Sequence, residues 1–105
     1  MERGEIRWYT FKSPDKKRPV VILTRNSAIN LLAEVTIAPI TSTIREIPTE
    51  VILDQQDGMK ASSAINLDHI QTVSKSKVGA YITKLSDSKL DAIKPALLFA
   101  LGFDN

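Results

Sequence analysis

The hydrophobic pattern of the chain changes period near its end, and this change limits the folds that the sequence can adopt. The apolar residues that recur there at spacings of three and four are Leu90, Ile93, Leu97 and Leu101. This spacing places them on one face of a helix. Ser86 is suited to cap its N-terminus, and Gly102 is suited to end it. Pro95 has no N–H for the carbonyl of Asp91, which predicts a kink.

Before this helix, short β-branched and apolar runs alternate with turn residues. The strands expected from these runs cover residues 6–11, 19–24, 35–41, 49–53, 64–67, 70–73 and 80–85. Residues 13–15 and 57–58 predict turns. Residues 26–32 predict a short helical turn that is capped by Asn26 or Ser27.

Short strands followed by one helix predict a mainly β protein of the α+β class, a small β-barrel with a helix packed on it. Proline donates no ladder hydrogen bond, so Pro19 is expected at the first position of its strand and Pro39 at an edge or a bulge. The 105 residues predict one domain. A domain of this size buries only about 60% of its unfolded surface, so dimerisation would add stability.

The residue types exclude several chemistries. The sequence contains no cysteine, which excludes disulfides and thiolate metal sites. His69 is the only histidine, so one chain cannot build a two-histidine zinc site or a pair of catalytic histidines. Asp54 and Asp57 are interpreted as turn residues because no phosphate-binding glycine loop accompanies them. We therefore expect neither a metal nor another cofactor.

Charge and hydropathy suggest a cytoplasmic protein that does not enter a membrane. Charged residues follow Met1 at once, and the longest apolar runs, 20–23 and 96–101, are far shorter than the roughly 18 residues of a span. The net charge is only +2. The basic residues that gather in one stretch are Lys12, Lys16, Lys17, Arg18 and Arg25. Such a stretch attracts phosphate, although a solvated surface loop is its commoner meaning.

Several blocks of sequence occur in a recognisable order. They are residues 3–6 (RGEI) with Trp8, 17–22 (KRPVVI), 37–42 (IAPITS) and 66–73 (NLDHIQTV), followed by the helical segment 85–102. Together these blocks resemble the MazF/PemK family of toxins along nearly the whole chain. The resemblance implies a single toxin domain over residues 1–105, with an SH3-like barrel of the CcdB/MazF type and a C-terminal helix.

The resemblance also implies an activity and partners. Its members are expected to be homodimers that bind single-stranded RNA in a groove across the interface. They cut RNA sequence-selectively when the 2′-hydroxyl attacks the scissile phosphate, without a metal, and would ignore DNA. A cognate antitoxin is expected to block the groove with a disordered tail.

The family pattern assigns catalytic roles to Arg18, Thr41 and Asp68. The Arg18 guanidinium would stabilise the charge of the phosphorane, although it could be a surface arginine held beside proline. Thr41 would bond a phosphate oxygen or relay a proton, although a threonine at a strand end can also cap the backbone. Asp68 would accept the 2′-hydroxyl proton if it is partly buried, although it could be a strand-end aspartate paired with a lysine.

The resemblance also implies a set of RNA-binding residues. These are Lys16, Lys17, Ser42, Asn66 and Gln71. Asn66 and Gln71 stand where some relatives have arginine, and the histidine that some relatives carry before Arg18 is missing. His69 could replace it as an acid or a base, but neighbours on a strand point to opposite faces. If Asp68 faces the groove, His69 is therefore expected to face away.

Two other functions fit the same fold. Toxins of this fold that bind and inhibit DNA gyrase resemble each other at a C-terminal tip that bears tryptophan, whereas the only tryptophan of this chain is Trp8. The chain could also be a non-catalytic module that binds RNA through Lys12, Lys16, Lys17 and Arg18 and leaves the RNA intact.

Overall fold

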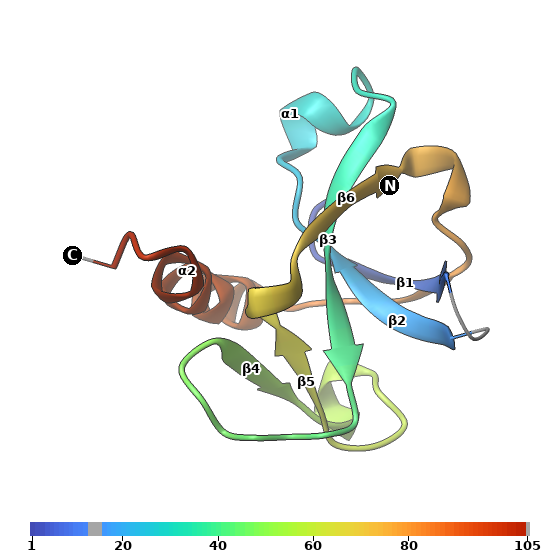
Figure 1. Ribbon diagram of the computed structural model, residues 1–105. Coiled ribbons are helices and arrows are strands. Elements are labelled where there is room, and N and C mark those ends of the chain that lie inside the picture. The colour runs from blue at the N-terminus through green and yellow to red at the C-terminus, as the bar shows by residue number, and fades with distance from the viewer. Residues whose placement is uncertain (13–15, 105) are drawn as a thin grey trace.

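The computed structural model describes residues 1–12 and 16–104, and it shows a curled antiparallel sheet with a long helix beside it (Figure 1). The strands are β1 (Glu5–Phe11), β2 (Lys16–Ile22), β3 (Glu34–Thr41), β4 (Glu50–Leu53), β5 (Ser63–Asn66), β6 (Gln71–Ser74) and β7 (Tyr81–Lys84). The helices are α1 (Asn26–Ile29) and α2 (Asp87–Leu101), with 3₁₀ turns η1 (Gln55–Asp57), η2 (Leu67–His69) and η3 (Lys75–Lys77). The expected mainly β fold with a terminal helix is confirmed. The turn predicted at residues 13–15 lies outside the described residues.

Strand β3 connects the two parts of the sheet. Its first residues, from Glu34 to Ile37, pair with β6, whereas Ile40 and Thr41 pair with β5. Along its other edge β3 pairs with β2, which is followed by β1 and β7. Because β3 changes partner along its length, the sheet curls, and β4 and β5 lie apart from β1 and β2 in Figure 1.

Pro19 is not at the expected first position, and Pro39 is not at an edge, whereas the alternative of a bulge at Pro39 stays a prediction. Pro19 is an interior residue of β2 and not its first. Pro19 pairs with Trp8 of β1. The N–H and C=O groups of Trp8 point away from β2, since they bond to the backbone of residues 80 and 79. Pro19 and Trp8 are therefore a pair without mutual hydrogen bonds, and the backbone nitrogen of Pro19 faces away from β1. The missing N–H of Pro19 therefore costs the β1–β2 ladder no hydrogen bond. Pro39 does not mark an edge, because β3 is a central strand; it lies between the segments that pair with β6 and with β5.

The main core lies between the sheet and α2. Its buried residues are Ile6, Val21, Ala38, Ile40, Val51, Leu53, Ile65, Leu67, Leu85, Ile93 and Ala96. Leu90 and Leu97 pack against this cluster, which confirms the predicted apolar face of the helix over most of its length. Leu101, in the last turn, is 51% exposed and differs from that prediction. Burial at roughly 25 cal/mol per Å² of apolar surface is what holds α2 on the sheet.

The ends of α2 are as the sequence predicts. Ser86 accepts a hydrogen bond from the Lys89 N–H at 3.3 Å, and Gly102 has the left-handed φ of 81° that ends the helix. The helix continues through Pro95 without a break, and the kink stays a prediction.

The predicted cap of the first helical turn is wrong. Arg25 is the N-cap residue of α1, and no side chain caps this helix. The Asn26 side chain is used elsewhere, because its Oδ1 accepts a hydrogen bond from the Arg3 N–H at 2.7 Å. The same interaction ties the N-terminal segment to α1.

Candidate active site

Arg18, in β2, lines two neighbouring hollows. The first, which we call the Trp8 hollow, has a volume of about 430 Å³. Its lining residues are Trp8, Arg18, Pro19, Ile40, Thr41, Ser42, Thr43, Gly58, Met59, Lys60, Ala61, Ser62, Ser63 and Ile82. The second, which we call the His69 hollow, has a volume of about 300 Å³, and it is lined by Phe11, Lys16, Arg18, Pro39, His69 and Gln71. Arg18 is therefore the residue that the two hollows share.

The end of β3 supplies hydroxyl groups to the Trp8 hollow. Thr41 and Ser42 both line it, together with Arg18. The Thr41 Oγ1 accepts a hydrogen bond from the Thr43 N–H at 3.1 Å, which is the backbone-capping role described above as the alternative. A hydroxyl that accepts one bond still has its own proton to donate. Thr41 can therefore cap the strand and donate to a phosphate oxygen at the same time.

The turn η2 determines where Asn66, Asp68 and His69 point. The Asn66 Oδ1 accepts from the Asp68 N–H at 3.0 Å and so caps η2. Its Nδ2 lies 3.3 Å from the His69 Nδ1. Because residues 67–69 form a 3₁₀ turn, the alternation of side chains along a strand does not apply to Asp68 and His69. The expectation that His69 faces away rested on that alternation.

His69 lines the hollow beside Arg18, whereas Asp68 is not among the residues that line either hollow. Asp68 is exposed, and its Oδ2 accepts from the Thr49 hydroxyl at 2.7 Å. This contact agrees with the structural alternative for Asp68, with Thr49 in place of the lysine. The catalytic role of Asp68 stays a prediction.

The basic stretch is divided between different surfaces. Lys16 lines the His69 hollow with Arg18. The Lys17 Nζ lies 5.1 Å from the centre of the Trp8 ring, a cation–π distance. Arg25 instead lines a different hollow, near the end of α2. Lys16, Lys17 and Arg18 therefore form the basic group near the candidate site.

Ser63 is a site residue that the sequence did not reveal. It is 7% exposed and lines the Trp8 hollow, and its hydroxyl has no hydrogen-bond partner among the described residues. A buried hydroxyl without a partner is costly. Its place in the site depends on how the segment of residues 58–63 folds back towards β2, which no local pattern in the sequence indicates.

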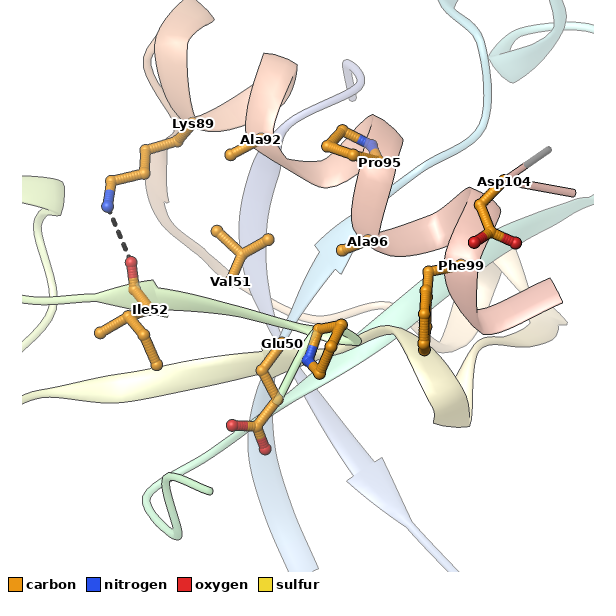
Figure 2. Close-up of a pocket in the computed structure, with 10 residues that line it drawn as sticks. Glu50, Val51, Ile52, Lys89, Ala92, Pro95, Ala96, Phe99 and Asp104 are labelled. Atoms are coloured by element: carbon orange, nitrogen blue, oxygen red, sulfur yellow. Dashed lines mark hydrogen bonds between the residues drawn. The ribbon is translucent and has the colours of Figure 1, made fainter. Parts of the chain in front are cut away.

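The groove shown in Figure 2 contains none of the predicted site residues. It has a volume of about 520 Å³ and lies between β4 and α2. Two of its charged side chains are engaged, since the Lys89 Nζ donates to the Ile52 carbonyl at 2.7 Å and Glu50 accepts from the N–H groups of residues 45 and 46. The third, Asp104, lies near the end of the chain and is the other carboxylate that lines the groove.

Within the described ranges, no cluster of His, Asp or Glu side chains is arranged to hold a metal ion. No described helix is long and apolar enough to cross a membrane.

Comparison with known proteins identifies the class of protein. Residues 2–101 match the family described as PemK-like, MazF-like toxin of type II toxin-antitoxin systems. The chain therefore belongs to this family.

Two endoribonucleases of Mycobacterium tuberculosis are similar to this chain in sequence. The chain is 37% identical over 100 residues to the probable endoribonuclease MazF5, covering 94% of this chain and 91% of MazF5. It is 41% identical over 88 residues to the endoribonuclease MazF3, covering 84% and 82% of the two chains.

Solved structures agree with this assignment. The M. tuberculosis toxin MazF-mt6 superposes with a TM-score of 0.87 at 36% identity, over 96% of this chain and 99% of that toxin. A mycobacterial endoribonuclease in complex with its cognate antitoxin gives a TM-score of 0.86 at 27% identity, over 97% and 95%. The MazF-type fold that the sequence predicts is confirmed.

Proposed function

We propose that this endoribonuclease of the MazF family cleaves single-stranded RNA at selected sequences and without a metal ion. In the proposed reaction the 2′-oxygen bonds to the adjacent phosphorus, and the bond from phosphorus to the 5′-oxygen breaks. A base takes the hydroxyl proton, and the leaving 5′-oxygen gains a proton. The products are a 2′,3′-cyclic phosphate end and a 5′-hydroxyl end.

The position of Arg18 between the two hollows is the observation that carries this proposal. A guanidinium there can bond two oxygens of the scissile phosphate and stabilise the charge that grows in the phosphorane. Thr41 has a hydroxyl proton to donate on one side, and Lys16 supplies a second positive charge on the other. These groups provide the electrostatic part of the catalysis.

The Trp8 hollow supports sequence selectivity. Its volume of about 430 Å³ is within the range of small-ligand sites. The Trp8 ring offers an aromatic surface for stacking, which is worth roughly 1–3 kcal/mol per base. The Ser63 hydroxyl has no partner among the described residues and is fully buried, so it can pair with the edge of that base only when the lining of the hollow moves apart. We propose that one base next to the scissile phosphate is read here, with Ser42 at the rim.

We further propose a cytoplasmic homodimer that a cognate antitoxin inhibits by occupying the RNA groove. A hollow of about 500 Å³ at the end of α2 supports the dimer, because Leu32 and Leu101 line it beside charged residues and are 48% and 51% exposed. Contiguous exposed apolar surface marks protein interfaces. The complex of a related endoribonuclease with its cognate antitoxin supports inhibition by such a partner.

The test is to incubate the purified protein with a long single-stranded RNA in excess chelator and to map the ends. Arg18→Ala should lower the cleavage rate by at least about 100-fold, because it removes a donor to the phosphorane. The matched control is Lys94→Ala, which removes an exposed cation of α2. Circular dichroism and sedimentation should show the same fold and assembly in all proteins.

Discrete cuts with cyclic phosphate ends, made by the unmutated protein and the control but not by Arg18→Ala, are expected. Equal cleavage by a folded Arg18→Ala protein would remove Arg18 from the mechanism. Intact RNA with the unmutated protein would favour the RNA-binding module or the gyrase inhibitor, which a gyrase assay separates.

A further inference from the structure

We propose that His69 is a hydrogen-bond donor to an RNA phosphate and that Asn66 holds its ring in the Nε2–H tautomer. This inference rests on the proposed RNA substrate and assigns a role to a residue that the family pattern left open. The evidence is a chain of hydrogen bonds that leads from the backbone of η2 to the imidazole ring.

The orientation of the Asn66 amide is fixed first. Its Oδ1 accepts from the Asp68 N–H at 3.0 Å, so the group that lies 3.3 Å from the His69 Nδ1 is the amide NH₂. Asn66 is only 8% exposed, and a flipped amide would place its NH₂ against the Asp68 N–H. The amide NH₂ donates and does not accept. Nδ1 is therefore the acceptor.

This contact assigns the tautomer of His69. With Nδ1 accepting from Asn66, the single proton of a neutral imidazole lies on Nε2. Nε2 is then the polar atom of the ring that can donate to a ligand. The only nitrogen with a lone pair to accept a proton is Nδ1, which Asn66 already occupies. The arrangement therefore favours a hydrogen-bond donor over a general base.

The surroundings of His69 indicate what it binds. It lines its hollow with Lys16 and Arg18, both from β2, and the exposed Asp68 is its neighbour on η2. The Asp68 carboxylate is held by Thr49 at 2.7 Å and does not line this hollow. An N–H donor beside two cations suits an anion with several acceptor oxygens. In RNA that anion is a phosphate.

Two substitutions at His69 distinguish a hydrogen bond donated to RNA from a purely structural contact with Asn66. His69→Gln carries an N–H₂ group near the position of Nε2, whereas His69→Asn carries an acceptor near the position of Nδ1 and nothing near Nε2. The probe is a labelled single-stranded RNA with a 2′-deoxy nucleotide at the cut found for the unmutated protein. It retains every phosphate and cannot be cleaved. If no cut is found, an unmodified RNA of the same length is the probe.

We expect the Kd of His69→Gln for the probe to stay within roughly twofold of that of the unmutated protein. The Kd of His69→Asn should be about tenfold higher, because this variant loses one charge-assisted hydrogen bond to a phosphate. Thermal unfolding should show both variants folded. Equal weakening by both substitutions, or by neither, would overturn the assignment. Weaker binding by His69→Gln together with unchanged binding by His69→Asn would also overturn the assignment. In that case the role of His69 would be to accept the hydrogen bond from Asn66 and not to donate to RNA. If the unmutated protein leaves RNA intact but the binding difference is found, the proposed cleavage fails and the donor role stands.

Discussion

Hydroxyl groups of the site differ in how fully their hydrogen-bonding capacity is used. The Thr41 oxygen accepts from the Thr43 N–H, so its cost of burial is partly met within the chain. The buried Ser63 oxygen has no partner among the described residues. A group that is unsatisfied in the free protein has the most to gain from a ligand, because binding removes an existing penalty. Because the Ser63 oxygen is fully buried, this gain is realised only if the lining of the hollow moves and exposes the hydroxyl to the base.

Replacing Ser63 by alanine should change selectivity without harming the fold. Removal of an unsatisfied buried hydroxyl should leave the free energy of unfolding unchanged or raise it by about 1 kcal/mol. The distribution of cleavage sites on a long RNA should broaden, because one polar contact to the base is lost. Sequencing of the cleaved ends and urea unfolding measure the two effects.

The matched control is Ser27→Ala, on the exposed surface of α1. It should leave both the site distribution and the stability within roughly 0.5 kcal/mol of the unmutated protein. An unchanged distribution in Ser63→Ala would show that the hydroxyl reads no base.

At the level of elements, the sequence predicts the strands and α2 well because their signals are local. The apolar spacing from Leu90 to Leu97, the Ser86 cap and the Gly102 end all depend on nearby residues. The site is less predictable, because η2 is a single 3₁₀ turn between two strands. Strand alternation therefore does not predict the direction of the His69 side chain. The environment of Pro19 is also hard to predict, because it depends on hydrogen bonds between Trp8 and residues 79–80, which are distant in sequence.

Helix α2 contains a correctable defect at Pro95. The residue lies in the interior of the helix and is exposed, and it cannot donate to the Asp91 carbonyl. Pro95→Ala should raise the free energy of unfolding by about 1–3 kcal/mol, since proline is roughly 3 kcal/mol worse than alanine inside a helix. Urea unfolding followed by circular dichroism measures the change.

Lys94→Ala is the control for this substitution, because it changes a neighbouring exposed residue that has an N–H. It should stay within roughly 0.5 kcal/mol of the unmutated protein. A loss of stability in Pro95→Ala would mean that the contacts of the proline ring outweigh the missing hydrogen bond.

At the scale of the whole molecule, the curled sheet brings together residues that are distant in sequence. β2 contributes Lys16 and Arg18, the end of β3 contributes Thr41, and η2 contributes His69. The partner change along β3 places these elements around one surface. The exposed end of α2 is formed by different residues, so a substitution there can test assembly without changing a side chain of the candidate site.

Leu101→Arg should convert the proposed homodimer into a monomer. The side chain is 51% exposed and lines the hollow at the end of α2 with Leu32, so an arginine would add a positive charge to those of Arg3 and Arg25 in the expected interface. Sedimentation velocity over a range of concentrations measures the oligomeric state. The cleavage rate should fall when the dimer is lost, because the RNA groove is proposed to cross the interface. Ile52→Arg is the matched control, since Ile52 is 38% exposed in the separate groove between β4 and α2. A monomeric Ile52→Arg with a dimeric Leu101→Arg would place the interface at β4 instead, and a monomeric unmutated protein that still cuts RNA would refute the shared groove.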